Sequence, residues 1–180
     1  MSGISALHEH NHTVQFYGDD GALLHELKGH IGKALTRGSS AIIIATSAHI
    51  DGLARQLKSQ GIDLSRASAE SRYIALEASH VLSKFMVDGL PNRVLFSDAI
   101  GQVISRAASA SLDENRRVVA FGEMVALLWA EGKYEAAIQL EKLWNELTSA
   151  VVHFLDTQRS PFRHLLAAEV RRCNFLCLGP

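Results

Sequence analysis

Polar side chains suited to binding or acid–base chemistry stand at the ends of strand-like segments in this 180-residue chain. Asp20, Thr46, His49 and Glu123 each fall at or shortly after such an end. In sheets built mostly from parallel strands, ligands bind beyond the carboxyl ends of the strands. The sequence therefore predicts that these strand tips form the binding site.

Glu123 has two interpretations, because it follows an apolar strand and opens an apolar helix. Its carboxylate either caps the N-terminus of that helix, where negative charge is stabilised, or projects into the cleft as an acid. Capping is the commoner role of such a residue. The position directly after Phe121 and Gly122 keeps the second role open.

The first turn between a strand and a helix reads YGDDGAL over residues 17–23. Nucleotide-binding proteins of this class carry glycines there, with a lysine and a hydroxyl that contact the outer phosphates. Here Asp19 and Asp20 take those places, and their carboxylates repel phosphate oxygens. The turn therefore argues against an ordinary ATPase. A Gly-x-Ser-x-Gly motif is absent too, so the sequence does not indicate hydrolysis through a serine nucleophile.

Trp129 and Trp144 lie on apolar helical faces, where aromatic rings line a pocket or, more commonly, belong to the core. We leave both roles open for them. His8, His10 and His12 alternate, so an extended segment would place three imidazoles on one face as metal ligands. Such a polar stretch is more commonly a flexible tail, to which we assign residues 1–11.

The two cysteines, Cys173 and Cys177, are four residues apart, and the chain has no others. They cannot complete a tetrahedral zinc set with a neighbouring histidine pair, and they form no disulfide framework. We therefore expect two unpaired thiols, and the sequence predicts no metal site and no cofactor.

Apolar residues alternate between strand-like and helix-like spacing along the chain, which is typical of an α/β fold. Residues 41–46 form a β-branched run expected of a central parallel strand covered on both faces. Right-handed crossovers then predict a three-layer α/β sandwich with a mostly parallel central sheet. The other predicted strands are 12–17, 72–76, 118–122 and 151–155, and helices are expected from 22, 50, 81, 96, 123 and 134 onward.

Composition excludes several classes of protein. The chain is 47% hydrophobic and 21% charged, which fits one compact domain. Eighteen basic and 19 acidic residues give a formal net charge of −1, so no excess of cations is available for nucleic acid. No apolar run approaches the roughly 20 residues of a spanning helix, and the N-terminus lacks the order of a secretory signal. We expect a cytoplasmic protein without direct membrane or nucleic-acid contact.

A set of motifs in fixed order resembles the MEDS domain, the sensory domain of DcmR-type regulators from methanogens and methylotrophs. The resemblance covers about residues 12–154. The motifs are HTVQFY (12–17), GKALTRG (32–38) before IIIAT (42–46), FMVDG (85–89), FGEMV (121–125), LLW (127–129) and LEKLWN (140–145).

The resemblance implies a RecA/KaiC-like core that has lost its phosphate loop, in agreement with the acidic first turn. It implies sensing rather than catalysis, with small hydrocarbon derivatives as proposed ligands and a histidine kinase or a transcriptional regulator as partner. The family's characteristic positions include Phe121 and Glu141. Ten of the residues selected by the strand tips or by the resemblance are our candidate ligand-binding residues. They are His12, Phe16, Tyr17, Asp20, Thr46, His49, Glu123, Trp129, Trp144 and Asn145.

The C-terminus departs from the family pattern, which closes soon after the Trp-Asn helix with a strand. We assign 12–155 to the sensory domain and 156–180 to an atypical segment with a helix and a possible edge strand. Residues 162–172 are either an inserted helix in that segment or part of an aberrant tail. An unpaired edge would promote association or aggregation.

The sequence thus predicts a non-catalytic sensory or signal-relay domain of bacterial or archaeal signal transduction or transcriptional regulation. It would bind a small ligand or a regulatory protein. One alternative is a degenerate RecA-like nucleotide-binding protein with residual NTPase activity, in which Glu123 positions water or a metal near a phosphate. Another is a protein-interaction scaffold that holds no small ligand.

Overall fold

The structure is a computed structural model that describes residues 12–15, 19–114, 116–153 and 173–178, with side chains given for 19–114 and 116–147. Strands and helices alternate along most of the chain. In order they are β1 (His12–Gln15), α1 (Asp20–Thr36), β2 (Ser40–Ala45), α2 (Ser47–Ser59), α3 (Leu64–Ala69), β3 (Tyr73–Glu77), α4 (Ala78–Leu82), β4 (Met86–Val87), β5 (Leu90–Pro91), α5 (Arg93–Ala110), β6 (Val118–Gly122), α6 (Met124–Ala130), α7 (Tyr134–His153) and β7 (Cys173–Leu178).

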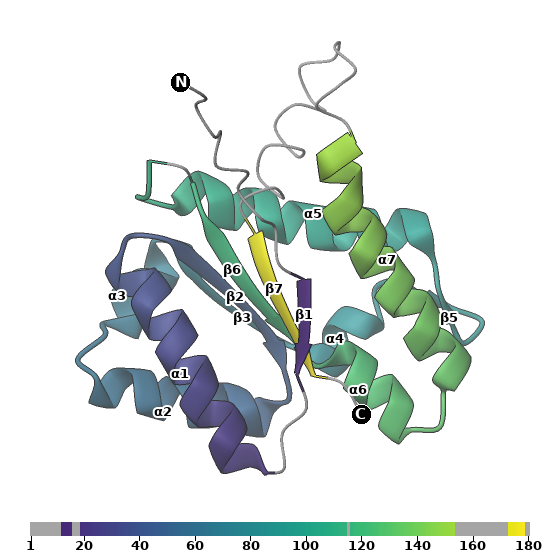
Figure 1. Ribbon diagram of the computed structural model, residues 1–180, viewed down its shortest axis with the longest axis horizontal. Helices are drawn as coiled ribbons and strands as arrows, with labels where there is room; N and C mark the ends of the chain where they lie inside the picture. Colours follow the sequence, from purple (N-terminus) through teal and green to yellow (C-terminus); the bar gives the residue numbers. More distant parts are fainter. Residues whose placement is uncertain (1–11, 16–18, 115, 154–172, 179–180) are drawn as a thin grey trace, which may run out of the picture.

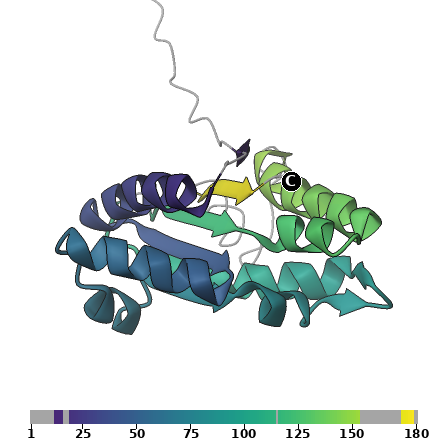
Figure 2. The ribbon, with the colours of Figure 1, turned by 90° about the horizontal axis from the view of Figure 1, so that it is seen from below.

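Five parallel strands form the main sheet in the order β1-β7-β6-β2-β3. Helices α1–α3 cover one face and α4–α7 the other (Figure 1). The view turned by 90° shows β2, β6 and β7 between these two groups of helices (Figure 2). The predicted α/β sandwich with a parallel sheet and helices on both faces is confirmed.

The central strand β2 is buried along its whole length, as its β-branched run predicts. Ile42 and Ile44 pack into the apolar cluster beneath α4–α7, whereas Ile43 packs into the cluster beneath α1–α3. Side chains of a strand alternate between its faces, so one six-residue strand supports both layers of the core.

A turn with a left-handed glycine separates α1 from β2. Gly38 has φ +86°, and a Cβ there would lie 3.3 Å from Cβ of Leu112. Gly38 also accepts hydrogen bonds from the backbone N–H groups of Leu112 and Asp113 through its carbonyl. This glycine follows the end of α1, and its carbonyl also holds the loop that follows α5.

Two predictions of local structure are wrong. The helix expected to run from 81 through Met86 ends at Leu82, and Met86–Val87 instead pairs antiparallel with Leu90–Pro91. Asp88 and Gly89 between them have φ of +50° and +81°, as a two-residue hairpin turn requires. The strand expected at 151–155 is also wrong for its described part, because α7 continues to His153, with no glycine or proline to stop it.

The C-terminal strand is present, but it does not lie at the edge. Residues of β7 pair with β6 on one side and with β1 on the other, with Phe175 opposite both Ala120 and His12. The edges of the sheet are β1 and β3 instead. Residues 1–11, 16–18 and 154–172, where we expected the tail, the end of the first strand and the inserted helix, lie outside the described part.

Tyr73, at the start of β3, buries its hydroxyl without a hydrogen-bond partner among the described residues. Burial raises the pKa of Tyr73 to about 12, from 10.0 for an ordinary tyrosine. We expect Tyr73→Phe to raise the free energy of unfolding at neutral pH by about 1 kcal/mol, because an unpaired buried polar group is removed. Chemical denaturation followed by circular dichroism measures the change.

The same substitution should alter the alkaline limit of stability. The unfolded chain releases the Tyr73 proton near pH 10, whereas the folded chain keeps it to about pH 12, so stability falls as pH rises through this window. The stability of the Tyr73→Phe variant should fall less steeply with pH in this window. Tyr134→Phe, at a half-exposed tyrosine, is the matched control and should behave as the unsubstituted protein. A Tyr73→Phe variant that is less stable at neutral pH would refute this account.

Candidate functional site

Four of the predicted strand-tip residues meet at the carboxyl ends of β2 and β6. Thr46 follows β2 and caps α2, His49 lies in the first turn of α2, Glu123 follows β6, and Asp20 opens α1. Strands β2 and β6 are neighbours, with Ile44 opposite Gly122. The sheet thus brings together residues that are up to 103 positions apart in the sequence. We call Asp20, His49 and Glu123 the acid–histidine cluster.

Glu123 is the centre of this cluster, with only 2% of its surface exposed. One carboxylate oxygen, Oε2, accepts a hydrogen bond of 2.8 Å from the backbone N–H of Thr46. The other oxygen, Oε1, contacts Nδ1 of His49. The backbone N–H of Glu123 donates to the carbonyl of Ile44 at 2.9 Å, which ties the residue to β2 a second time.

The capping role considered for Glu123 is wrong. Glu123 stands at the N-cap position of α6, but its side chain makes no hydrogen bond to that helix. It reaches across to the N-terminus of α2, whose free N–H groups attract a negative charge as those of α6 would. The neighbouring strand β2 delivers that second helix end, so the carboxylate joins two strands instead of closing its own helix.

His49 links the buried Glu123 to an exposed acid. Its Nε2 lies 3.3 Å from Oδ1 of Asp20, and the side chain of His49 is 17% exposed, against 84% for Asp20. The backbone N–H of His49 is bonded at 3.4 Å to Oγ1 of Thr46. The imidazole thus has a carboxylate oxygen close to each of its two nitrogens. The cluster therefore connects α1, α2 and the end of β6 through one partly accessible ring.

Glu77, at the tip of β3, behaves differently. It caps α4, accepting hydrogen bonds from the Ser79 hydroxyl at 2.6 Å and from the His80 N–H at 2.8 Å. These two donors hold the pKa of Glu77 below its usual value, with the Ser79 hydroxyl as the larger cause. Of these two glutamates, Glu77 caps the helix that follows it, whereas Glu123 bonds to the end of the neighbouring strand β2.

The N-terminus of α1, in the acidic first turn, is already capped by a side chain of that turn. Asp19 caps α1, and its Oδ1 accepts a hydrogen bond of 2.9 Å from the N–H of Ala22. A phosphate at this position would meet the carboxylates of Asp19 and Asp20 and would compete with the capping bond. Within the part of the chain described, no group of three or more His, Cys, Asp or Glu residues is arranged to hold a metal ion.

Of the other candidates whose side chains are described, none lies in this cluster. Trp144 is 3% exposed and packs edge-on against Phe96, with ring centroids 5.1 Å apart, in the core between α5 and α7. Trp129 is 39% exposed and packs against Tyr134. Asn145 is exposed on α7. His12 is described only as part of β1, and Phe16 and Tyr17 lie outside the described residues.

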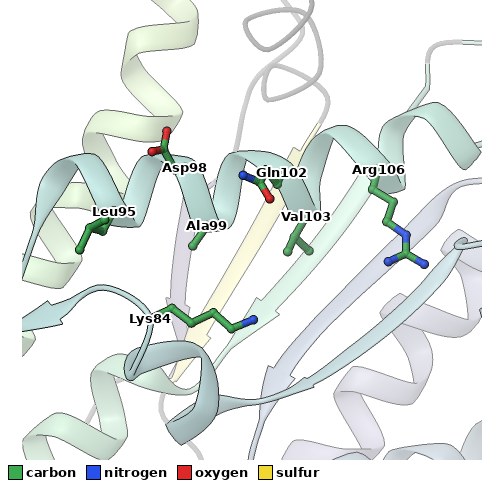
Figure 3. A pocket seen from close by; sticks show the side chains of 7 residues that line it. All are labelled: Lys84, Leu95, Asp98, Ala99, Gln102, Val103 and Arg106. Carbon is green, nitrogen blue, oxygen red and sulfur yellow. The ribbon is translucent and has the colours of Figure 1, made fainter.

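A surface hollow of about 510 Å³ lies away from the cluster, beside α5. Leu95, Ala99 and Val103 give it an apolar side along the helix, while Lys84 extends from the segment after α4 (Figure 3). Sequence reasoning missed this hollow, because the unpredicted β4–β5 hairpin sets how the segment of Lys84 returns to α5. The apolar positions four residues apart on α5 were its only signal.

The described helices contain no stretch long and apolar enough to pass through a bilayer. Comparison with protein-family models gives a match over residues 11–153 to the family described as MEDS, the methanogen/methylotroph, DcmR sensory domain. Comparisons with curated proteins and with solved structures give no match. The expected likeness to the RecA/KaiC core therefore stays a prediction. The family match spans most of the chain and coincides with the predicted resemblance, so this protein belongs to the MEDS sensory-domain family.

Proposed function

We propose that this chain is a non-catalytic sensory domain whose ligand engages the acid–histidine cluster at the carboxyl ends of β2 and β6. Membership of the MEDS family gives it a sensory or signalling role. The observation that carries the proposal is His49, held between the buried Glu123 and the exposed Asp20. A single accessible ring thereby touches elements that a signal would have to move relative to one another.

The two contacts of His49 differ in how readily they exchange. The contact with Glu123 is buried, and Glu123 is fixed further by the N–H of Thr46. The contact with Asp20 is exposed to water, and surface ion pairs of this kind contribute about 0–1 kcal/mol. A ligand that bonds to Nε2 of His49 can displace Asp20, so it favours the arrangement in which the start of α1 is free of His49.

The charges of the site suggest the chemistry of its ligand. Asp19, Asp20 and Glu123 give the surroundings of His49 an excess of negative charge, which opposes anionic molecules. A neutral or cationic molecule with a group that hydrogen-bonds to imidazole fits best. A regulatory protein that presents such a group, as part of a histidine kinase or a transcriptional regulator, is the corresponding macromolecular partner.

Native mass spectrometry of protein purified from its own cells tests the proposal. We expect a retained small molecule or partner in the unsubstituted chain, and its loss in His49→Gln and Asp20→Asn. Asp51→Asn removes another exposed carboxylate from α2 and is the matched control, which should keep the bound species. Retention of the same species by His49→Gln would place the ligand elsewhere.

The residual-NTPase alternative is tested by titration with Mg-ATP. Both carboxylate oxygens of Glu123 are already engaged, which leaves the residue poorly placed to orient water at a phosphate. We expect no binding at micromolar concentration. Micromolar binding that Glu123→Gln abolishes would overturn the non-catalytic proposal. A protein partner that the unsubstituted chain and His49→Gln retain equally, with no small molecule, would favour the scaffold alternative.

A further inference from the structure

The face of α1 that lies beside the connection from α2 to α3 forms a groove of about 490 Å³. Lys28 and Lys33 of α1 and the C-cap residue Arg37 line one side, and Gln60 and Ile62 line it from the connection. Helices α1 and α2 lie side by side in this part of the molecule (Figure 1). We call this hollow the cationic groove. It lies along the second half of α1, whereas the acid–histidine cluster lies at the start of that helix.

A glycine creates the groove by allowing close approach. Gly32 is buried, and a Cβ there would lie 2.8 Å from Oε1 of Gln60 and 3.4 Å from Cδ1 of Ile62. One turn earlier, Gly29 leaves open space where a Cβ would stand. The bottom of the groove is therefore formed by the backbone at Gly29 and Gly32, and the cationic side chains surround it.

The charge of the groove is of one sign. Three cations and no carboxylate line it, although the whole chain has a formal net charge of −1. Within the described ranges, none of the three cations forms an ion pair. Lys33 lies in the last turn of α1 and Arg37 is its C-cap residue, and the helix dipole favours cations at this end. Lys28 lies more than a turn earlier, so the dipole does not account for it.

The length of the groove limits its occupant. From Lys28 to Arg37 the helix rises about 14 Å, which an extended segment of about four residues would span. Three cations are too few to bind nucleic acid, because proteins that bind DNA neutralise about 6–10 phosphates. An extended segment that places two or three carboxylates opposite the cations matches the groove in both length and charge.

We propose that the cationic groove binds an acidic segment of a protein partner, to which the sensory domain passes its signal. This inference rests on the proposed function and names the chemistry of its output partner. Helix α1 joins the two places, because Asp20 opens it at the cluster and the cations lie along its second half. A ligand that displaces Asp20 from His49 changes the position of the same helix that the partner holds.

Titration of the ¹⁵N-labelled full chain with hexaglutamate peptide, followed by NMR, tests the groove. We expect the largest amide shifts at Gly29, Gly32 and Lys33, and weaker affinity as salt rises. Hexaglutamine is the control peptide and should cause no shifts there. Combined Lys28→Gln, Lys33→Gln and Arg37→Gln should weaken binding of hexaglutamate at least tenfold.

A second triple variant removes the same number of charges elsewhere. Lys84→Gln, Lys133→Gln and Lys142→Gln together should leave the affinity within twofold of the unsubstituted chain. Equal weakening by both triples, or shifts spread over the whole surface, would show unspecific attraction and overturn the proposal. Inorganic phosphate that binds the groove as tightly as the peptide would assign it to a small anion instead. Peptide binding is read without any ligand at His49, so failure here leaves the proposed ligand site standing, and the reverse holds too.

Discussion

Trp144→Ala is expected to lower the free energy of unfolding by about 4 kcal/mol, the largest effect of any single substitution considered for this chain. The ring of Trp144 is almost fully buried and packs edge-on against Phe96, which packs edge-on against Phe85 at 5.2 Å. Removal of the indole leaves a cavity that this row of aromatic rings cannot close. Urea denaturation followed by circular dichroism measures the loss.

Trp129→Ala is the matched control, because it removes the same side chain from an exposed position. We expect it to change stability by about 1 kcal/mol or less. Binding of the ligand or partner should be measured on both variants. Loss of stability alone in Trp144→Ala supports its place in the core, whereas a stable Trp144→Ala protein that no longer binds would return this tryptophan to the ligand site.

Glu123→Ala is expected to lower the free energy of unfolding by about 3 kcal/mol, because it breaks a buried network and leaves its partners without an acceptor. The N–H of Thr46 and Nδ1 of His49 both lose their contact with the carboxylate. Thermal and chemical denaturation at neutral pH measure the size of this effect.

Glu123→Gln separates the charge from the shape of the side chain. The carboxamide keeps the volume and one acceptor oxygen, so we expect a smaller loss of stability than for Glu123→Ala. Asp51→Asn, on the exposed face of α2, should leave stability unchanged. If Glu123→Ala proves as stable as the unsubstituted chain, then the buried carboxylate does not hold β6 to α2. The proposal that Glu123 fixes His49 in the ligand site would then be wrong.

The sequence predicts most of the fold because the strongest patterns are local. The β-branched run of β2 predicts a buried central strand, and the structure contains it at that place. Glycines with positive φ, Gly38 and Gly132, follow the ends of α1 and α6. Asp88 and Gly89 carried a hairpin signal as well, but the apolar stripe before them also fits a helix. The end of α7 was missed because Val151 and Val152 are good strand residues that a continuing helix tolerates.

The candidate site could be predicted in part, because strand tips share one edge of a parallel sheet. That rule predicted that Asp20, Thr46, His49 and Glu123 lie together, and the structure places them in contact. It could not predict that β6 lies next to β2, since strand order depends on contacts between distant segments. Without that order, the bond from Glu123 to Thr46 cannot be distinguished from a cap on α6. The cationic groove was missed for a similar reason, because Gln60 and Ile62 reach α1 only after α2 has turned back along it.

The pairing of β1 with β7 has a consequence for synthesis of the chain on the ribosome. Both partners of β2, which are β3 and β6, are translated by residue 122, whereas His12 waits for Phe175. At bacterial or eukaryotic rates of about 5–20 residues per second, that wait lasts on the order of ten seconds. During translation β1 therefore emerges first and remains without β7, its one neighbour among the described strands, so its backbone groups stay unpaired until the end of synthesis.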